Sequence, residues 1–412
     1  MSESTVGPAT WRSLFAVREF RLLWTAQAVS LTGDQLARVA IAVLVFERTH
    51  SALLTGVVYA TTFLPWLIGG PLLGGLADRY RRRTVMVVCN LASAVLVAVL
   101  AIPGQPIGLL CTLLFIVVLL ESPFLSARAA LIADVLPDDR YVLASALSSL
   151  TIQLAQVLGF AAGGALVALV GAQQALLLDA ATFLLSAVIV RLAVLDRPSA
   201  GGTDEAAGLR AWRRQMAAGI RLVFGDPYLR LLVALAWLAT FSVVPEGLAA
   251  PYTHSLHGSA VAVGLFLAAQ PTGASLGGLV LSRFVAPARR LELMAPLAVL
   301  SCVPLLLFVL HPGLPLALAL LAVSGIGMSY NLPANAAFVQ TVPAAQRGQA
   351  FGLVAAGLVA GQGLSIAAAG AIADHVAPAV VIAVAGGLGT AAAVLVTGVD
   401  RRLSTSATPV LR

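Results

Sequence analysis

Long apolar runs separated by short polar connectors dominate the sequence. Twelve runs are close to 20 residues or longer, the length that a helix needs to cross the hydrocarbon core of a bilayer. Because lipid offers the backbone no hydrogen-bond partners, each run is predicted to be a transmembrane helix. The predicted spans are 20–46, 52–77, 83–102, 106–128, 141–170, 172–195, 228–253, 259–284, 289–310, 314–336, 346–373 and 378–397.

The composition indicates a protein surrounded by lipid. The 412 residues are 59% hydrophobic and only 10% charged, whereas soluble domains carry about 25% charged residues. So few charges cannot cover a water-facing surface, and the chain is predicted to be an all-α integral membrane protein. The net charge of +7 does not indicate a nucleic-acid partner, because the basic residues are confined to connectors and span ends.

The basic residues predict the orientation in the bilayer. All 25 are arginine, and cytoplasmic connectors are the ones that collect basic residues. With both termini inside, 23 of the 25 arginines lie on cytoplasmic connectors or span ends, while Arg48 lies outside and Arg38 within the first span. We therefore predict a multi-pass protein of the cell membrane with both termini in the cytoplasm.

The sequence repeats itself at about half its length. The Gly-Gly-Leu sequence at 74–76 recurs at 277–279, at corresponding spans. Such matching landmarks are typical of transporters built by duplication. The predicted organisation is a six-helix half at 1–195, a cytoplasmic connector at 196–227 and a second six-helix half at 228–412. The latter part of the connector is predicted to be an amphipathic helix at the inner interface.

The connector between the second and third spans carries the most specific motif. It follows the pattern Gly-x-Leu-Ala-Asp-Arg-x-Gly-Arg-Arg, with Arg81 in place of the second glycine. This pattern resembles the signature loop of the major facilitator superfamily, and the resemblance covers nearly the whole chain. It implies two bundles of six helices and a gate on the cytoplasmic side.

The resemblance also implies roles for individual loop residues. In the family, the aspartate at the position of Asp78 faces the positive end of span eleven and holds the inner side closed. A loop with only a topological role would explain the arginines but not Asp78. The gating residues implied are Gly74, Asp78, Arg79, Arg82 and Arg83.

Two further segments resemble one branch of that superfamily. They are Phe20-Arg21-Leu22-Leu23-Trp24 at the start of span one and Arg128, Ala129 and Leu131 near the end of span four. The resemblance is to the macrolide-efflux and enterobactin-exporter branch. It implies a secondary transporter that moves amphipathic small molecules outward in exchange for protons, with antibiotic resistance as one possible consequence.

Span five carries a glycine-rich sequence that has a functional and a purely structural interpretation. Antiporters of the family have Gly-Pro-x-x-Gly-Gly there, whereas this chain has Phe160 at the proline position. The glycines allow helices to pack closely, but the proline bend is absent. The alternative is that small residues merely pack helices together. The helix-packing residues are Gly159, Gly163 and Gly164.

Charged side chains inside the spans are the candidates for proton coupling. Asp34 and Arg38 are one helical turn apart in span one, so they share a face and can pair. Glu121 in span four and Glu246 in span seven are the other two candidates. An ionised carboxylate costs about 2.5–3.5 kcal/mol at mid-bilayer, so such residues normally face a cavity. The alternatives are a structural ion pair for Asp34 and Arg38, and a position near outer water for Glu246.

The remaining polar residues predict no cofactor or metal site. Asp179 and Asp374 are placed close to the outer surface and are assigned no role. The three cysteines lie inside apolar runs, and the five histidines lie on separate outer turns. No lysine is present, so no P-loop for a nucleotide exists. Energy is expected from an ion gradient or from the gradient of the substrate itself.

Together these features predict a monomeric secondary transporter with a small-molecule substrate, protons and the lipid bilayer as partners. An importer or facilitator of a small nutrient is the first alternative, since a fold does not fix the direction of transport. A membrane enzyme or receptor is the second. An enzyme would need a nucleophile, a base or metal ligands clustered at one depth, and the sequence does not predict such a cluster.

Overall fold

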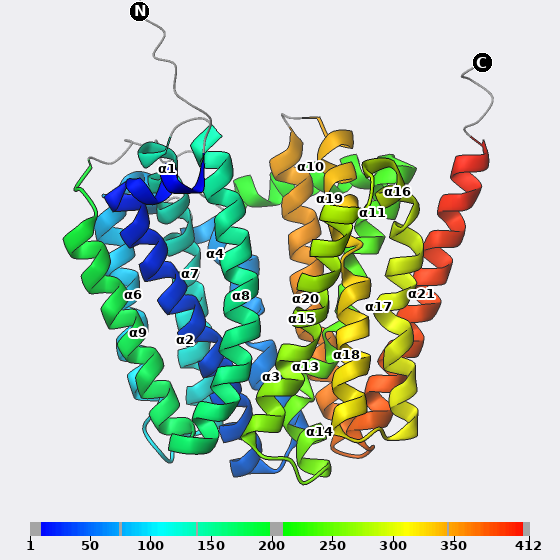
Figure 1. The fold of residues 1–412 in the computed structure, drawn as a ribbon, viewed down its shortest axis with the longest axis horizontal. Coiled ribbons are helices and arrows are strands. Elements are labelled where there is room, and N and C mark those ends of the chain that lie inside the picture. Colours follow the sequence, from blue (N-terminus) through cyan, green and yellow to red (C-terminus); the bar gives the residue numbers. More distant parts are fainter. Residues whose placement is uncertain (1–9, 74–75, 137–138, 198–208, 344–345, 407–412) are drawn as a thin grey trace, which may run out of the picture. The chain divides into compact units, whose positions relative to one another are not determined.

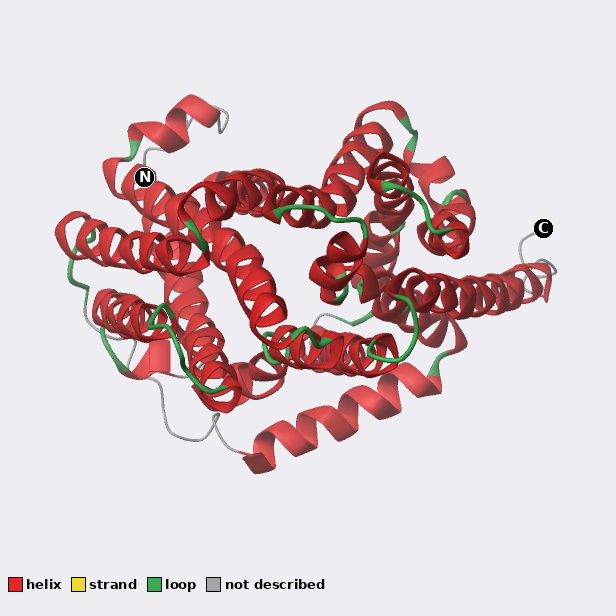
Figure 2. Cartoon of the chain, turned by 90° about the horizontal axis from the view of Figure 1, so that it is seen from below, coloured by secondary structure: helices red, strands yellow, loops and turns green. Residues whose placement is uncertain are grey.

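The computed structural model describes residues 10–73, 76–136, 139–197, 209–343 and 346–406. Every regular element among them is helical (Figures 1 and 2). Twelve spans are long and apolar enough to cross a membrane, which confirms the predicted all-α membrane fold. They are Arg18–Thr49, Ala52–Gly69, Arg82–Leu100, Ile107–Val135, Arg140–Val170, Ala172–Ala193, Pro227–Gly247, Ala260–Phe284, Arg289–Leu310, Leu314–Thr341, Arg347–Ala373 and Pro378–Gly398.

Two spans are longer than the apolar pattern predicts. The fourth continues to Val135 and the tenth to Thr341, whereas the sequence pattern ends them at 128 and 336. A polar or charged residue ends an apolar run without ending a helix, and arginine is a good helix former. The extension of the fourth span places Arg128 well inside a helix rather than at its end.

The chain forms two compact units. Unit 1 consists of Met1–Ala40 and Ile68–Gly208, and unit 2 of Ile41–Leu67 and Leu209–Arg412. The helices of unit 1 are α1 (Trp11–Ala16), the first part of α2 (Arg18–Thr49), most of α4 (Leu64–Leu73), α5 (Leu76–Arg79), α6 (Arg82–Leu100), α7 (Ile107–Val135), α8 (Asp139–Val170) and α9 (Ala172–Ala193).

Besides the rest of α2 and the start of α4, unit 2 contains α3 and all helices from α10 onward. These are α3 (Ala52–Ala60), α10 (Leu209–Gly225), α11 (Pro227–Trp237), α12 (Ala239–Ser242), α13 (Val244–Gly247), α14 (Ala249–Ser255), α15 (Ala260–Phe284), α16 (Pro287–Glu292), α17 (Met294–Leu306), the 3₁₀ helix η2 (Leu307–Leu310), α18 (Leu314–Met328), α19 (Asn331–Thr341), α20 (Arg347–Ala373) and α21 (Pro378–Ser406).

Residues 41–67 belong to unit 2, although they lie early in the sequence. The reason is the packing of α3 along α20, where glycines let the two backbones approach each other. A Cβ at Gly56 would lie 3.0 Å from the carbonyl oxygen of Ile366, and one at Gly370 would lie 2.6 Å from that of Ala52. The compact units therefore divide the first two spans between them, whereas the six-helix halves predicted from the sequence repeat do not.

The seventh span and the segment that follows it are broken into four short helices. Turns at Leu238, Val243 and Leu248 separate α11, α12, α13 and α14. Pro245 is the second residue of α13 and Pro251 lies within α14, and proline cannot donate the backbone hydrogen bond that continues a helix. This span is therefore less regular than its neighbours.

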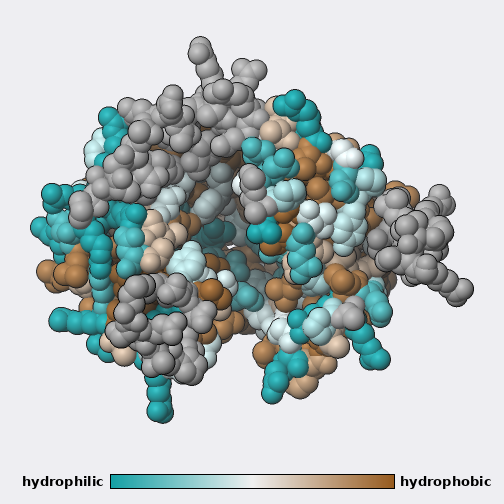
Figure 3. All heavy atoms as spheres, turned by 90° about the horizontal axis from the view of Figure 1, so that it is seen from above, coloured by the Kyte–Doolittle hydropathy of each residue, from teal (hydrophilic) through white to brown (hydrophobic). Residues whose placement is uncertain are grey.

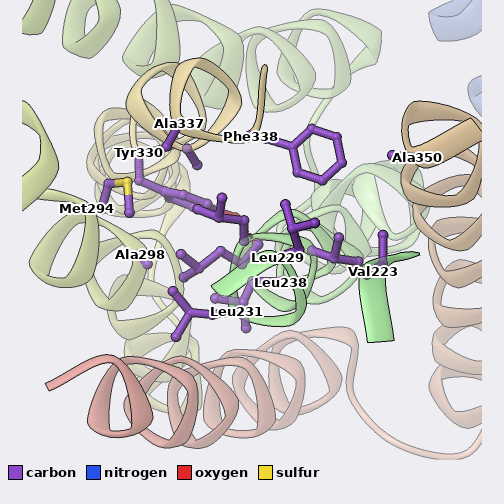
Figure 4. Close-up of a cluster of buried hydrophobic side chains, with 14 of the residues drawn as sticks. Val223, Leu229, Leu231, Leu238, Met294, Ala298, Tyr330, Ala337, Phe338 and Ala350 are labelled. Carbon is purple, nitrogen blue, oxygen red and sulfur yellow. Dashed lines mark hydrogen bonds between the residues drawn. The ribbon is translucent and has the colours of Figure 1, made fainter. Parts of the chain in front are cut away.

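The largest described core of unit 2 gathers side chains from α10, α11, α17 and α19 (Figure 4). Leu229 and Met294 are buried there beside Tyr330, whose hydroxyl donates a 2.8 Å hydrogen bond to the carbonyl of Leu235. The predicted amphipathic helix corresponds to α10, and its Val223 is fully buried in this core. A Cβ at Gly219 would lie 2.6 Å from the carbonyl oxygen of Gln349, so α10 is packed directly on α20.

Many of the described residues on the face shown in Figure 3 are hydrophilic. In unit 1, the connector after α5 carries several arginines. There Arg82 is paired with Asp134 of α7, and the guanidinium of Arg83 lies 3.2 Å from the carboxylate of Asp196. Ion pairs of this kind keep the connector polar while the spans remain apolar.

Candidate transport site

Helices α2, α6, α7 and α9 of unit 1 surround a cavity of about 60 Å³, enough for a few water molecules. Its walls combine apolar side chains with amides, hydroxyls and carboxyls, which is the mixture expected of a small-molecule site. The lining residues are Gln27, Ser30, Leu31, Asp34, Cys89, Asn90, Ser93, Leu120, Glu121, Phe124, Leu125 and Phe183.

Two of the predicted proton-coupling residues line this cavity. Asp34 comes from α2 and Glu121 from α7, and both are half-buried. The guanidinium of Arg38, one turn along α2, acts electrostatically on both carboxylates. The structure therefore brings together Asp34, Arg38 and Glu121.

Asp179, to which the sequence analysis assigned no role, is part of the same cluster. Its side chain is only 2% exposed, and its charge acts on Asp34. A Cβ at Gly33 would lie 2.4 Å from the Asp179 carboxylate and 2.3 Å from the Thr182 hydroxyl. The sixth span begins at residue 172, as predicted, and Asp179 lies about two turns into α9; its inclusion in the cluster depends on the packing of α9 against α2.

A buried polar cluster lies beside the cavity, between α2, α7 and α8. The Arg128 guanidinium is 7% exposed. It donates hydrogen bonds to the side-chain oxygen of Gln27 and, at 2.9 Å, to the Ser148 hydroxyl. Gln27 is 3% exposed and reaches the cavity wall. On the same helices, the indole of Trp24 donates to the Thr151 hydroxyl at 2.8 Å.

The predicted gating residues are only partly within the described structure. Gly74 lies outside the described residues, and Asp78 belongs to α5 but its side chain is not described. Arg79 lies over the ring of Tyr80, with 5.9 Å between guanidinium carbon and ring centroid. Besides its pair with Asp134, Arg82 donates to the carbonyl of Ala130 at 3.2 Å. Arg83 donates to the carbonyl of Val194 at 3.3 Å, in addition to its ion pair.

The glycines of span five lie at a close contact between α8 and α2. A Cβ at Gly159 would lie 2.7 Å from the Cβ of Gln35, and one at Gly163 would lie 3.0 Å from the Cα of Leu36. Gly164 is buried, and so is Phe160, which replaces the proline of the family pattern. Close packing of α8 therefore supports the segment of α2 that carries Asp34 and Arg38.

The fourth predicted coupling residue, Glu246, lies apart from this cluster, in unit 2. It belongs to α13 and is half-buried. Its carboxylate accepts a 3.0 Å hydrogen bond from the hydroxyl of Tyr59 on α3. Glu246 thus links a helix from early in the sequence to the broken seventh span.

Asp374 has a structural role that the sequence prediction did not assign. It follows the C-terminal end of α20, and its carboxylate accepts three hydrogen bonds from the start of α3. These come from the Ser51 hydroxyl at 2.9 Å and the backbone nitrogens of Ala52 at 2.5 Å and Leu53 at 3.2 Å. A carboxylate at a helix N-terminus satisfies unpaired N–H groups and opposes the positive end of the helix dipole. This contact is called the Asp374 cap below.

The sequence contained a usable signal for one residue that was not assigned a site role. Arg128 was interpreted only as a feature of the branch resemblance, because the apolar run ends there. Had helix continuation to Val135 been recognised, an arginine inside a span would have joined the search for intramembrane charges. Nothing in the linear pattern, by contrast, indicates that Asp374 meets α3.

These features define a transporter: twelve spans, a polar cavity within one unit and buried charges grouped on the walls. The sequence matches the family described as Major Facilitator Superfamily over residues 23–248 and 244–410. The chain therefore belongs to the major facilitator superfamily. It is a secondary transporter and not an enzyme.

Several curated relatives are exporters by name. The chain is 25% identical over 367 residues to the multidrug efflux pump Tap of Mycolicibacterium fortuitum, covering 86% of this chain and 88% of that one. It is 27% identical over 370 residues to the enterobactin exporter EntS of Shigella boydii serotype 4, covering 87% and 86%. A shorter match, 32% over 102 residues, is to macrolide efflux protein A of Streptococcus pyogenes and covers 24% and 25%.

Solved structures support the fold. The nucleoside transporter NupG superposes with a TM-score of 0.68 at 15% identity, covering 92% of this chain and 98% of that one. A POT family transporter in complex with 5-aminolevulinic acid gives a TM-score of 0.72 at 11% identity, covering 93% and 96%. At these identities the similarity establishes the twelve-helix architecture and nothing about the substrate.

Proposed function

We propose that the protein exports a lipophilic or amphipathic small molecule of the drug, antibiotic or siderophore type, in exchange for protons. The names of the efflux relatives support the direction and the substrate class. The protein acts as a monomer by alternating access, in which the site opens to one side of the membrane and then to the other. Resistance to a toxic substrate would be one consequence of such export.

The observation that carries the proposal is the grouping in unit 1 of Asp34 with Glu121 and Asp179, with Arg38 acting on Asp34 and Glu121. Carboxylates that share a buried site repel each other when ionised, and binding a proton relieves this repulsion. The positive charge of Arg38 opposes this effect at Asp34 and Glu121. A change in water access to the cavity shifts the balance between these opposing effects, which is the requirement for a proton-coupled carrier.

Asp34 is the first candidate for the residue that binds and releases the proton, since it lines the cavity and is affected by all three neighbouring charges. Glu246 and Glu121 follow in that order. On the cytoplasmic side, we assign gating to the loop residues Gly74, Asp78, Arg79, Arg82 and Arg83. The Asp374 cap and the Tyr59–Glu246 hydrogen bond are assigned to closure of the outer side.

The proposal includes an orientation with both termini in the cytoplasm. Cysteine substitution at Gly313 tests it well, because this position has a negative φ and open space around its Cα. Gly104 and Gly171 are poorer choices, because their φ values of 85° and 88° strain any side chain. In a background without native cysteines, Gly313→Cys should react with an impermeant thiol reagent from outside. Arg81→Cys should not, and the reverse pattern would contradict the orientation.

Proton coupling is tested with the purified protein in liposomes. A fluorescent amphiphile is loaded, a pH gradient is imposed, and substrate and proton movements are recorded together. We expect transport to run against the substrate gradient only when protons move in the opposite direction. Transport that ignores the imposed pH gradient would contradict antiport.

A further inference from the structure

The cluster of Gln27, Arg128 and Ser148 contains a buried positive charge that has no negative partner among the described side chains. Arg128 is 7% exposed and lies within α7, seven residues before its last residue, Val135, or about 10 Å along the helix axis. Both of its described partners, the amide oxygen of Gln27 and the hydroxyl of Ser148, are uncharged. Among the described residues, no carboxylate forms an ion pair with Arg128.

Two polar atoms of this cluster are buried without hydrogen-bond partners. They are Nε of Arg128 and Nε2 of Gln27. The identity of the Gln27 atoms follows from chemistry, because a guanidinium can only donate and the amide oxygen must therefore face it. Both unpartnered atoms are consequently N–H donors. Buried donors without acceptors are costly, so this site is complementary to an acceptor that carries negative charge.

The cluster is connected to the candidate transport site. Gln27 lines the cavity that Asp34 and Glu121 also line. The acids and the basic cluster therefore occupy different parts of the same region of unit 1. A molecule in an enlarged form of this cavity would meet carboxyls from α2 and α7 on one side and donors from Gln27 on the other.

We propose that Arg128 and Gln27 form a subsite for an anionic group on the transported amphiphile, such as a carboxylate or an acidic phenol. This inference rests on the proposed export function and specifies its substrate class. Arg128 supplies the positive charge. Gln27, which is hydrogen-bonded to Arg128 and lines the cavity, supplies the contact with the substrate. A site that offers buried donors rejects molecules without an acceptor, because its donors then remain unpaired.

The test is equilibrium binding to the purified protein in nanodiscs of neutral phosphatidylcholine. Three probes share an anthracene ring and differ in the attached group: 9-anthracenecarboxylate, its neutral amide, and a 9-anthracenylmethyl trimethylammonium salt. We expect the wild-type protein to bind the carboxylate about tenfold more tightly than the amide and the cation, the lower end of what one hydrogen bond to a charged group contributes. Equal binding of the three probes, or no binding of the carboxylate, would overturn the proposal.

Substitutions separate the subsite from general effects on the fold. Arg128→Gln should abolish the preference for carboxylate over amide, while Arg128→Lys should retain part of it because the charge remains. Gln27→Met should reduce the preference without abolishing it. Arg221→Gln is the matched control, because it removes an exposed arginine on α10 and should leave the preference unchanged. A preference that survives in well-folded Arg128→Gln protein would assign the anion to another site.

Competition experiments distinguish an anionic substrate group from a free small anion. Chloride or acetate would displace the carboxylate probe at similar concentrations if the site holds a free ion, and this result would overturn the assignment to substrate. We expect both to compete at least about tenfold more weakly, since they lack the apolar part. This binding test does not depend on proton coupling. If proton-driven transport is absent but the preference for carboxylate remains, the proposed antiport is refuted and the subsite is not.

Discussion

The acidic side chains of unit 1 and unit 2 have different surroundings. In unit 1, the charges of Glu121 and Asp179 act on Asp34, and Arg38 acts on Asp34 and Glu121. In unit 2, Asp374 and Glu246 each hold a hydrogen bond to α3, and Asp374 accepts three. One unit therefore groups its acids around a cavity, and the other uses them to join helices.

This difference separates two tasks that a coupled carrier must perform. A group of like charges responds to one proton with a large electrostatic change, and is suited to energy coupling. A carboxylate that caps a helix stabilises one packing arrangement and is suited to holding a closed state. Substitutions that leave shape intact but remove charge should therefore affect the two units in different ways.

The largest effect is expected for Asp34→Asn. Proton-driven accumulation should fall to the level of protein-free liposomes, because the exchangeable proton loses its binding site. Downhill exchange of substrate should persist, since the cavity remains. Both rates are measured in liposomes with and without a pH gradient. Retention of full proton-driven transport would move the coupling site elsewhere, with Glu246 tested next.

A smaller effect is expected for Asp374→Ala. Loss of a helix cap costs about 1 kcal/mol, or about a fivefold change in an equilibrium. The labelling rate of the cysteine in Thr55→Cys on α3 measures this change, because the Thr55 side chain is only 2% exposed in this structure. Labelling from outside should become about fivefold faster in the Asp374→Ala background, because loss of the cap shifts the equilibrium by that factor. Asp374→Asn is the control, since asparagine also caps helices, and unchanged labelling in both would exclude a role for the cap in closure.

Glu246→Gln should have a weaker effect on transport than Asp34→Asn. The amide can still accept the hydrogen bond from Tyr59, so only the charge is removed. We expect the pH dependence of the transport rate to shift without loss of coupling. Tyr59→Phe removes the hydrogen bond and keeps the charge, and should leave the pH dependence in place. Complete uncoupling by Glu246→Gln would make unit 2 a second coupling site.

The smallest effect is expected for the half-buried pair of Arg197 and Glu19, whose nitrogen and oxygen lie 2.6 Å apart. Hydrogen bonding to Glu19 raises the pKa of Arg197 further above its usual range. The guanidinium therefore stays charged until the pH rises through that value, far above neutrality. Arg197→Gln should lower the free energy of unfolding by up to about 1 kcal/mol. Thermal denaturation measures this, and a much larger loss would show that this connector is essential to unit 1.

The sequence predicted features that depend on composition and local spacing. Twelve spans, the helical fold and the family follow from apolar length and from the loop at 74–83, because lipid restricts the backbone to few choices. Asp34 and Arg38 were found because they are one turn apart on the same helix. Asp179 and Asp374 were missed, since their roles depend on which helices become neighbours. Contacts between segments 322 residues apart, such as that of Asp374 with Ala52, leave no trace in a single sequence.

The contact between α15 and α18 has a mechanical consequence. A Cβ at Gly273 would lie 1.8 Å from the carbonyl oxygen of Ala322, and one at Gly325 would lie 2.0 Å from that of Gln270. With backbone against backbone on both sides, neither helix can slide or rotate past the other without a steric clash. We expect this pair to move as one rigid rod. Bending during the transport cycle should then concentrate in the broken seventh span, at Leu238, Val243 and Leu248.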